Sequence, residues 1–70
     1  MSGSPSFADE LRAWRDEFLL SQARAALIFD VSVRTVQGWE RDRHRNEPSM
    51  AGPIRRLMQI YRESRSGPPD

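Results

Sequence analysis

A pair of short helical segments joined by a tight turn is the feature of this sequence that most constrains its fold. Ser21 is placed to cap a helix that ends near Phe29, because a serine hydroxyl accepts a hydrogen bond from a free N–H in the first helical turn. Ser32 is placed to cap a second helix, Val33 to about Arg41, in the same way. Asp30 lies in the turn between them, where the backbone needs a left-handed conformation that aspartate tolerates less well than glycine.

Apolar residues recur at helical spacing on both sides of this pair. Side chains three or four positions apart share one face of a helix, so the recurrence predicts amphipathic helices. A first helix capped by Ser6 and a last helix opened by Gly52, with Pro53 at its first position, therefore flank the pair. The expected inward residues are Phe7, Leu11, Trp14 and Phe18; Ala25, Ala26 and either Ile28 or Phe29; and Val31, Val36 and Trp39. The last helix carries an apolar stripe of Ile54, Leu57, Met58 and Tyr61. The fold class is thus all-α, a compact bundle of four to five helices.

The 70 residues of the chain suit one domain with a modest core, so a dimer is expected. We expect residues 1–5 to form a flexible arm, residues 6–64 the folded domain, and residues 65–70 a flexible tail that is rich in glycine and proline.

The chain has no cysteine, which excludes disulfides and thiolate metal sites. No apolar run approaches the roughly 18 residues of a membrane span, and the N-terminus lacks the features of a signal peptide. We therefore expect a soluble, cytoplasmic protein.

Charged residues are unevenly distributed, although the formal net charge is only +1. Carboxylates gather on the solvated side of the first helix, at Asp9, Glu10, Asp16 and Glu17. Basic residues gather in the third helix and the loop after it, at Arg34, Arg41, Arg43, His44 and Arg45. The 11 strongly basic residues are all arginine, whose planar fork grips guanine edges and phosphates. A GC-rich genome would produce the same preference without a functional reason.

Three pieces of sequence occur in order in the central pair, and together they match one known family pattern without insertion or deletion: Leu20-Ser21-Gln22 with Ala26, then Val31-Ser32, then Thr35-Val36 with Trp39-Glu40. By these residues the chain resembles the phage repressor and Cro-like helix-turn-helix family, which includes small antitoxin-type and anti-CRISPR-associated repressors. It departs from the family at Asp30, where glycine is usual. The resemblance implies a DNA-binding domain whose third helix lies in the major groove.

The resemblance also implies a role for individual residues. It implies that Val33 contacts a thymine methyl group, Arg34 contacts guanine and Gln37 contacts adenine. Phosphate contacts fall to Gln22, Thr35, Arg41, Arg43, His44 and Arg45, and a structural ion pair falls to Arg15 and Glu40. Each contact residue has a simpler interpretation as a solvated side chain, and the arginines at 41, 43 and 45 could instead pair with Asp42 and Glu47.

Gly38 stands inside the third predicted helix, where glycine costs about 1 kcal/mol relative to alanine. A close approach to DNA, a close neighbouring helix, or simple tolerance of an unfavourable residue would each account for it.

These features favour a sequence-specific regulator of transcription that binds double-stranded DNA, most simply a dimeric, autoregulatory repressor of phage or mobile-element type that reads an inverted repeat. The dimer seam is expected at Ile54, Leu57, Met58 and Tyr61, although the same stripe could close the core of one monomer. The alternative is a protein-interaction module, such as an antitoxin that covers a toxin. A single histidine, the lack of cysteine and no room for a sizeable pocket argue against an enzyme or a metal site, and no cofactor is expected.

Overall fold

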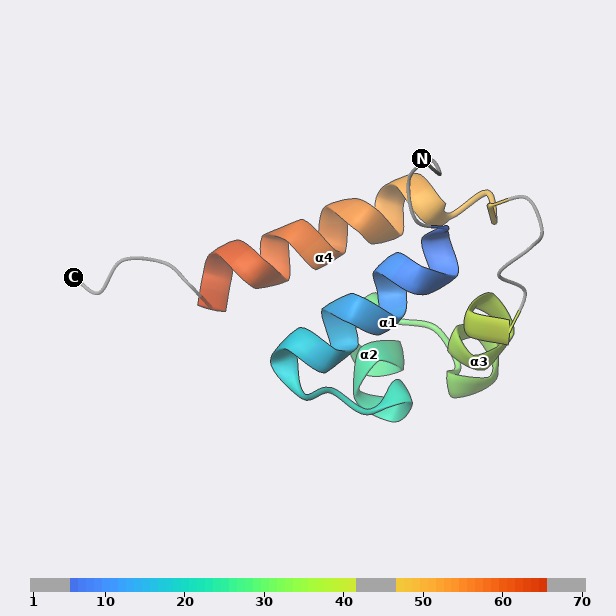
Figure 1. The fold of residues 1–70 in the computed structure, drawn as a ribbon, viewed down its shortest axis with the longest axis horizontal. Coiled ribbons are helices and arrows are strands. Elements are labelled where there is room, and N and C mark those ends of the chain that lie inside the picture. The colour runs from blue at the N-terminus through green and yellow to red at the C-terminus, as the bar shows by residue number, and fades with distance from the viewer. Residues whose placement is uncertain (1–5, 42–46, 66–70) are drawn as a thin grey trace, which may run out of the picture.

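The computed structural model describes residues 6–41 and 47–65, and all regular secondary structure within these ranges is helical. The helices are α1 (Phe7–Phe18), α2 (Gln22–Phe29), α3 (Val33–Arg41) and α4 (Ala51–Arg65). In Figure 1, α4 runs along the top of the molecule, α1 crosses beneath it, and α2 and α3 lie lower still. The fold is thus an all-α bundle, and none of the described helices is long and apolar enough to cross a membrane.

Each of the first three helices begins directly after a serine, as the sequence predicts. The Oγ atoms of Ser6 and Ser21 accept hydrogen bonds from the backbone N–H three residues further on, at 3.2 and 3.0 Å. Ser32 Oγ accepts the equivalent bond at 3.1 Å. These bonds satisfy N–H groups that have no partner within their own helix, so the helix starts are set by local sequence.

Two helices end in a non-glycine residue with left-handed backbone, Leu19 (φ 56°) after α1 and Asp30 (φ 60°) after α2. At both ends the next N–H donates to a carbonyl five positions earlier, at 2.8 Å after α1 and 3.0 Å after α2. This is the Schellman arrangement, which satisfies the last carbonyls of a helix. The left-handed turn expected at Asp30 is confirmed, whereas the one at Leu19 was not predicted.

The core gathers around the indole ring of Trp14. Its centroid lies 5.1 Å from that of Phe29 and 5.4 Å from that of Tyr61. Its Nε1–H donates to the backbone carbonyl of Met58 at 3.2 Å, which joins α1 to α4. The buried apolar residues are Phe7, Ala8, Leu11, Trp14, Ala25, Ala26, Phe29, Val36, Ala51, Ile54 and Met58, with Phe18, Leu20, Ile28, Val31, Trp39, Leu57 and Tyr61 packed against them. The inward faces predicted for α1, α2 and α3 are therefore confirmed, and Phe29 is more deeply buried than Ile28.

The last helix differs from the prediction at both ends. It begins at Ala51, so Pro53 stands at the third helical position and not at the first. The N–H groups of the first turn have no partner within the helix, so a proline there removes no helical hydrogen bond. The helix also includes Arg65, the first residue of the expected tail, whose guanidinium lies 5.5 Å from the centroid of an aromatic ring one turn earlier. The expected arm and the rest of the tail lie outside the described residues.

Candidate nucleic-acid interface

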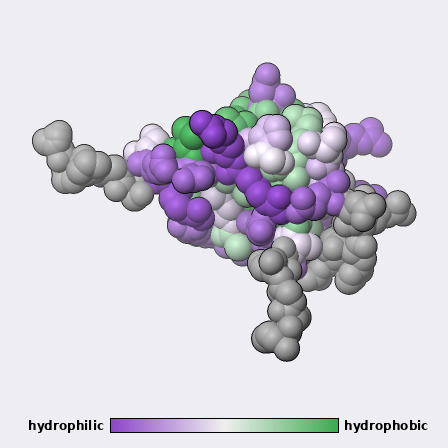
Figure 2. All heavy atoms as spheres, turned by 90° about the horizontal axis from the view of Figure 1, so that it is seen from above, coloured by the Kyte–Doolittle hydropathy of each residue, from purple (hydrophilic) through white to green (hydrophobic). Residues whose placement is uncertain are grey.

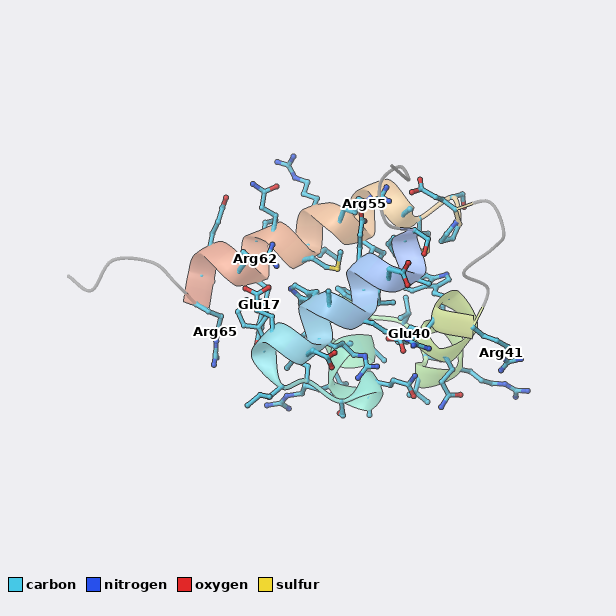
Figure 3. The ribbon with its side chains drawn as sticks, in the orientation of Figure 1. Glu17, Glu40, Arg41, Arg55, Arg62 and Arg65 are labelled. Carbon is cyan, nitrogen blue, oxygen red and sulfur yellow. The ribbon has the colours of Figure 1, made fainter. Side chains whose placement is uncertain are left out.

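The outward face of α3 carries the side chains expected to contact bases. Arg34 and Gln37 are exposed, and Val33 at the start of the helix is 39% exposed. Arg41 is also exposed and points away from the bundle in Figure 3. Positions three and four apart are neighbours on a helix surface, so residues 34, 37 and 41 follow one another along one face. The structure therefore brings these residues together on an accessible surface.

Gln22, at the first position of α2, connects that helix to α3. Its Nε2 donates to Glu40 Oε1 at 3.1 Å, and its Oε1 accepts from Gln37 Nε2 at 3.4 Å. The side chain of Gln37 is thereby held from the protein side. The sequence prediction gave Gln22 a phosphate contact and missed this bridge, because residues 15 and 18 positions apart along the chain meet only when α2 packs on α3.

Glu40 is the buried charged side chain of the described residues, with 4% of its surface exposed. Arg15 donates to it twice, from Nε to Oε2 at 2.7 Å and from Nη2 to Oε1 at 2.9 Å. The Nη1 group of Arg15 also donates to the Leu20 carbonyl at 3.0 Å. The hydrogen bond to Glu40 raises the pKa of the Arg15 guanidinium. The ion pair expected from the sequence is therefore present and ties α3 to α1, and Figure 3 shows Glu40 turned inward between them.

Of the remaining residues expected to contact phosphate, only Thr35 lies among the described residues. Thr35 is half-buried, and its Oγ1 lies 2.9 Å from Ser32 Oγ, so its hydroxyl is engaged at the start of α3. Arg43, His44 and Arg45 lie outside the described residues.

The α2–α3 side of the molecule carries positive charge that ion pairs do not neutralise. Within residues 6–41 and 47–65, neither Arg34 nor Arg41 forms an ion pair. The first turns of α2 and α3 contain no acidic residue, as is also true of α4, whereas that of α1 contains Asp9 and Glu10. The N-terminus of a helix carries about half a positive charge, which an acid in the first turn would offset. The two arginines and the starts of α2 and α3 therefore leave positive charge on this side.

Two of the arginines of α4, Arg55 and Arg62, are used differently. Arg55 Nε donates to Glu10 Oε1 at 2.6 Å, and its Nη2 pairs with Glu47. Arg62 Nε donates to Glu17 Oε2 at 3.2 Å, and Figure 3 shows the two side chains meeting between α4 and α1. These bonds hold the pKa of the Glu17 and Glu47 carboxyls below the usual range. Two acids that the sequence analysis assigned to a solvated face thus bind α4, and Glu47 has an arginine of α4 as its partner.

The stripe expected as a dimer seam belongs largely to the core of the monomer. Ile54 is 0% exposed and Met58 is 7% exposed, while Leu57 and Tyr61 are half-buried against the same core. The seam prediction is therefore corrected for Ile54 and Met58, because side chains enclosed in one molecule cannot also contact a second copy. The large apolar side chain that α4 does expose is Ile60, at 51%. Figure 2 looks down on the α4 side and shows hydrophilic side chains between smaller hydrophobic areas.

A cleft of about 710 Å³ lies between α1 and α4, although the sequence analysis expected no sizeable pocket. Trp14 and Met58 contribute apolar lining, and Glu10 and Arg55 contribute a charged pair that is already joined. Among the described residues there is no group of three acidic, histidine or cysteine side chains placed to hold a metal ion. The cleft and the α3 face are therefore different surfaces, the first lined by paired charges and the second by unpaired arginines.

Compared with models of protein families, with curated protein sequences and with solved structures, the chain matches none of them.

Proposed function

We propose that this protein is a sequence-specific regulator of transcription that binds double-stranded DNA and acts as a dimeric repressor on an inverted repeat, with autoregulation of its own gene as the simplest case. The observation that carries the proposal is the outward face of α3. Arg34, Gln37 and Arg41 are exposed there, and neither arginine has a carboxylate partner among the described residues. Arginine side chains that neutralise phosphates supply a large, salt-dependent share of the affinity for DNA.

The proposed mechanism places α3 in the major groove, which is wide enough to admit one helix. Arg34 then donates two hydrogen bonds to guanine O6 and N7, and Val33 packs on a thymine methyl. Gln37 pairs with adenine, and its contact with Gln22 restricts the rotamers from which it does so. The ordering of Gln37 lowers the conformational entropy that binding costs.

Phosphate contacts position the helix without reading sequence. Arg41 and Thr35 take this role among the described residues, together with Gln22 at the start of α2. By their place in the sequence, Arg43, His44 and Arg45 extend the same basic stretch. The Arg15–Glu40 ion pair fixes α3 on the scaffold, so that the base contacts are made from one orientation.

The testing experiment is a binding titration on the DNA directly upstream of the gene, compared with a random duplex of equal length. We expect tight, salt-sensitive binding that Arg34→Ala weakens by about 1 to 3 kcal/mol, the range for one bidentate base contact. Arg56→Ala is the matched control, because Arg56 is an exposed arginine on α4, away from α3. Wild-type protein that binds the upstream DNA no better than the random duplex would overturn autoregulation.

A protein-interaction module, such as an antitoxin that covers a toxin, is the second candidate. It is favoured by two exposed leucines, Leu19 at 91% and Leu27 at 74%, because exposed apolar side chains of this size can anchor a protein partner. DNA binding that is insensitive to both Arg34→Ala and Gln37→Ala would put this candidate first.

A further inference from the structure

Gly38 occupies the interior of α3, and nothing in the described protein requires a glycine there. None of the described glycines has positive φ, so the backbone at Gly38 is open to any L residue. A Cβ atom built at this position would meet no heavy atom within 4 Å, so no neighbouring helix excludes a side chain. Alanine would support the helix better than glycine does. Of the three explanations that the sequence leaves open, close packing of another helix is therefore removed.

Gly38 lies on the same face of α3 as Arg34 and Arg41. It lies four residues after Arg34 and three before Arg41, so helical geometry puts it between them on the same face. Both arginines are exposed. The missing side chain leaves the backbone of α3 uncovered between two cationic groups, on the face that the proposed function assigns to DNA.

The widths of an α-helix and of the major groove show why a missing side chain at Gly38 would matter for DNA binding. An α-helix with its side chains is about 10–12 Å across, and the major groove of B-DNA is about 12 Å wide and 8.5 Å deep. A helix therefore fits the groove with little clearance, and any side chain at the centre of the inserted face holds the backbone further from the bases. Hydrogen bonds to base edges weaken steeply when the distance or the angle departs from the optimum.

We propose that Gly38 is the point at which the backbone of α3 comes closest to the DNA, and that its lack of a side chain sets how deeply α3 enters the major groove. This inference rests on the proposed function. Gly38 is then a positioning residue: it donates nothing to a base, but it brings Arg34 and Gln37 within reach of the base edges.

The test compares Gly38→Ala with Gly52→Ala. Gly52 is the matched control, because it is also helical and a Cβ there also meets nothing within 4 Å, but it lies in the first turn of α4. Thermal unfolding and binding to the upstream DNA are measured for both variants. We expect Gly38→Ala to raise the melting temperature and to lower the affinity for that DNA at least tenfold, and Gly52→Ala to leave the affinity at the wild-type value. Gly38→Leu, with a larger side chain, should lower the affinity further than Gly38→Ala does.

The outcomes separate this inference from the function on which it rests. If wild type and Arg34→Ala behave as proposed and Gly38→Ala binds as tightly as wild type, the depth-setting role is overturned and the DNA-binding function stands. A lower melting temperature of Gly38→Ala would also overturn it, because the glycine would then serve the fold. If the wild-type protein does not bind DNA, both proposals fail.

Discussion

Two arginines on one side of this molecule are paired, whereas two on the other side are not. Arg56 and Arg65 of α4 also form no ion pair among the described residues, so the contrast lies between Arg55 and Arg62 on one side and Arg34 and Arg41 on the other. On the α1–α4 side, Arg55 and Arg62 pair with carboxylates and also lie over aromatic rings, at 5.5 Å from the Phe7 centroid and 5.8 Å from the Phe18 centroid. On the outer face of α3, Arg34 and Arg41 have no ion pair among the described residues. A net charge of +1 hides this division, because the acids of α1 offset charge on one side only.

The comparison indicates which charges serve the fold and which are available to a ligand. An arginine already held by a carboxylate gains little from a phosphate, because the existing hydrogen bonds must first be given up. An arginine that is only solvated exchanges water and counterions for the phosphate. We therefore expect substitutions on the α1–α4 side to change stability and those on the α3 face to change DNA affinity.

The largest expected effect is at Glu40, where the two sides are joined. Glu40→Gln leaves the half-buried guanidinium of Arg15 without a counter-charge, and we expect the free energy of unfolding to fall by about 3 kcal/mol. Chemical denaturation of the purified variant measures this change. Glu47→Gln is the control, because its carboxyl belongs to an exposed pair and should barely change the denaturation midpoint. A Glu40→Gln protein as stable as wild type would show that the buried pair contributes nothing to α3.

A smaller effect is expected at Arg41. If this side chain binds phosphate, Arg41→Ala should weaken binding to all duplexes alike and reduce the slope of log affinity against log salt by about 1. A salt titration on the upstream DNA and on a random duplex measures both quantities. Arg56→Ala should leave the slope unchanged. A loss confined to one DNA sequence would instead make Arg41 a base-reading residue.

The smallest effect is expected from the exposed pairs of the α1–α4 side, and it depends on pH. The hydrogen bond from Arg62 holds the pKa of folded Glu17 below its ordinary value of 4.5, and Glu47 is held low in the same way by Arg55. A carboxyl group whose pKa is lower in the folded state stabilises the fold at pH values above its unfolded-state pKa. That stabilisation is lost as the pH falls through the folded-state pKa. The melting temperature should therefore decline from about pH 4.5 downward, and less steeply in Arg62→Gln.

Thermal scans between about pH 6 and pH 3 measure that decline. Arg62→Gln should also bind DNA like the wild type at neutral pH. If it weakens binding as much as Arg41→Ala does, the division between the two sides is wrong.

Much of the local structure was predictable because its causes are local. Ser6, Ser21 and Ser32 each satisfy an N–H three residues away, so the sequence pattern shows the helix starts directly. Asp30 is a residue type that indicates a turn. Leu19 adopts the same left-handed backbone, but leucine rarely does so, and the sequence therefore gave no signal for a turn there. The start of α4 was misplaced by two residues, because proline is tolerated throughout the first helical turn.

The candidate site was only partly predictable. Helical spacing was enough to put Arg34, Gln37 and Arg41 on one face. The bridge from Gln22 to Gln37 and Glu40 was not visible, because it depends on how α2 packs against α3. The sequence also left open whether the apolar stripe on α4 forms a dimer seam or closes the core of one monomer. The structure places Ile54 and Met58 in the core.

The sequence by itself thus determined the all-α class, the three serine-capped helix starts and the residues that each of the first three helices turns inward, because hydrogen bonds and periodicity within one helix act over a few residues. Apart from the Arg15–Glu40 pair, which the family resemblance implied, only the tertiary structure decided which charges are paired. Glu10 and Glu17 meet arginines 45 positions away, and whether an arginine finds a carboxylate depends on where another helix lies. Among the described residues, that distribution separates the paired arginines Arg55 and Arg62 from the unpaired Arg34 and Arg41 of the α3 face.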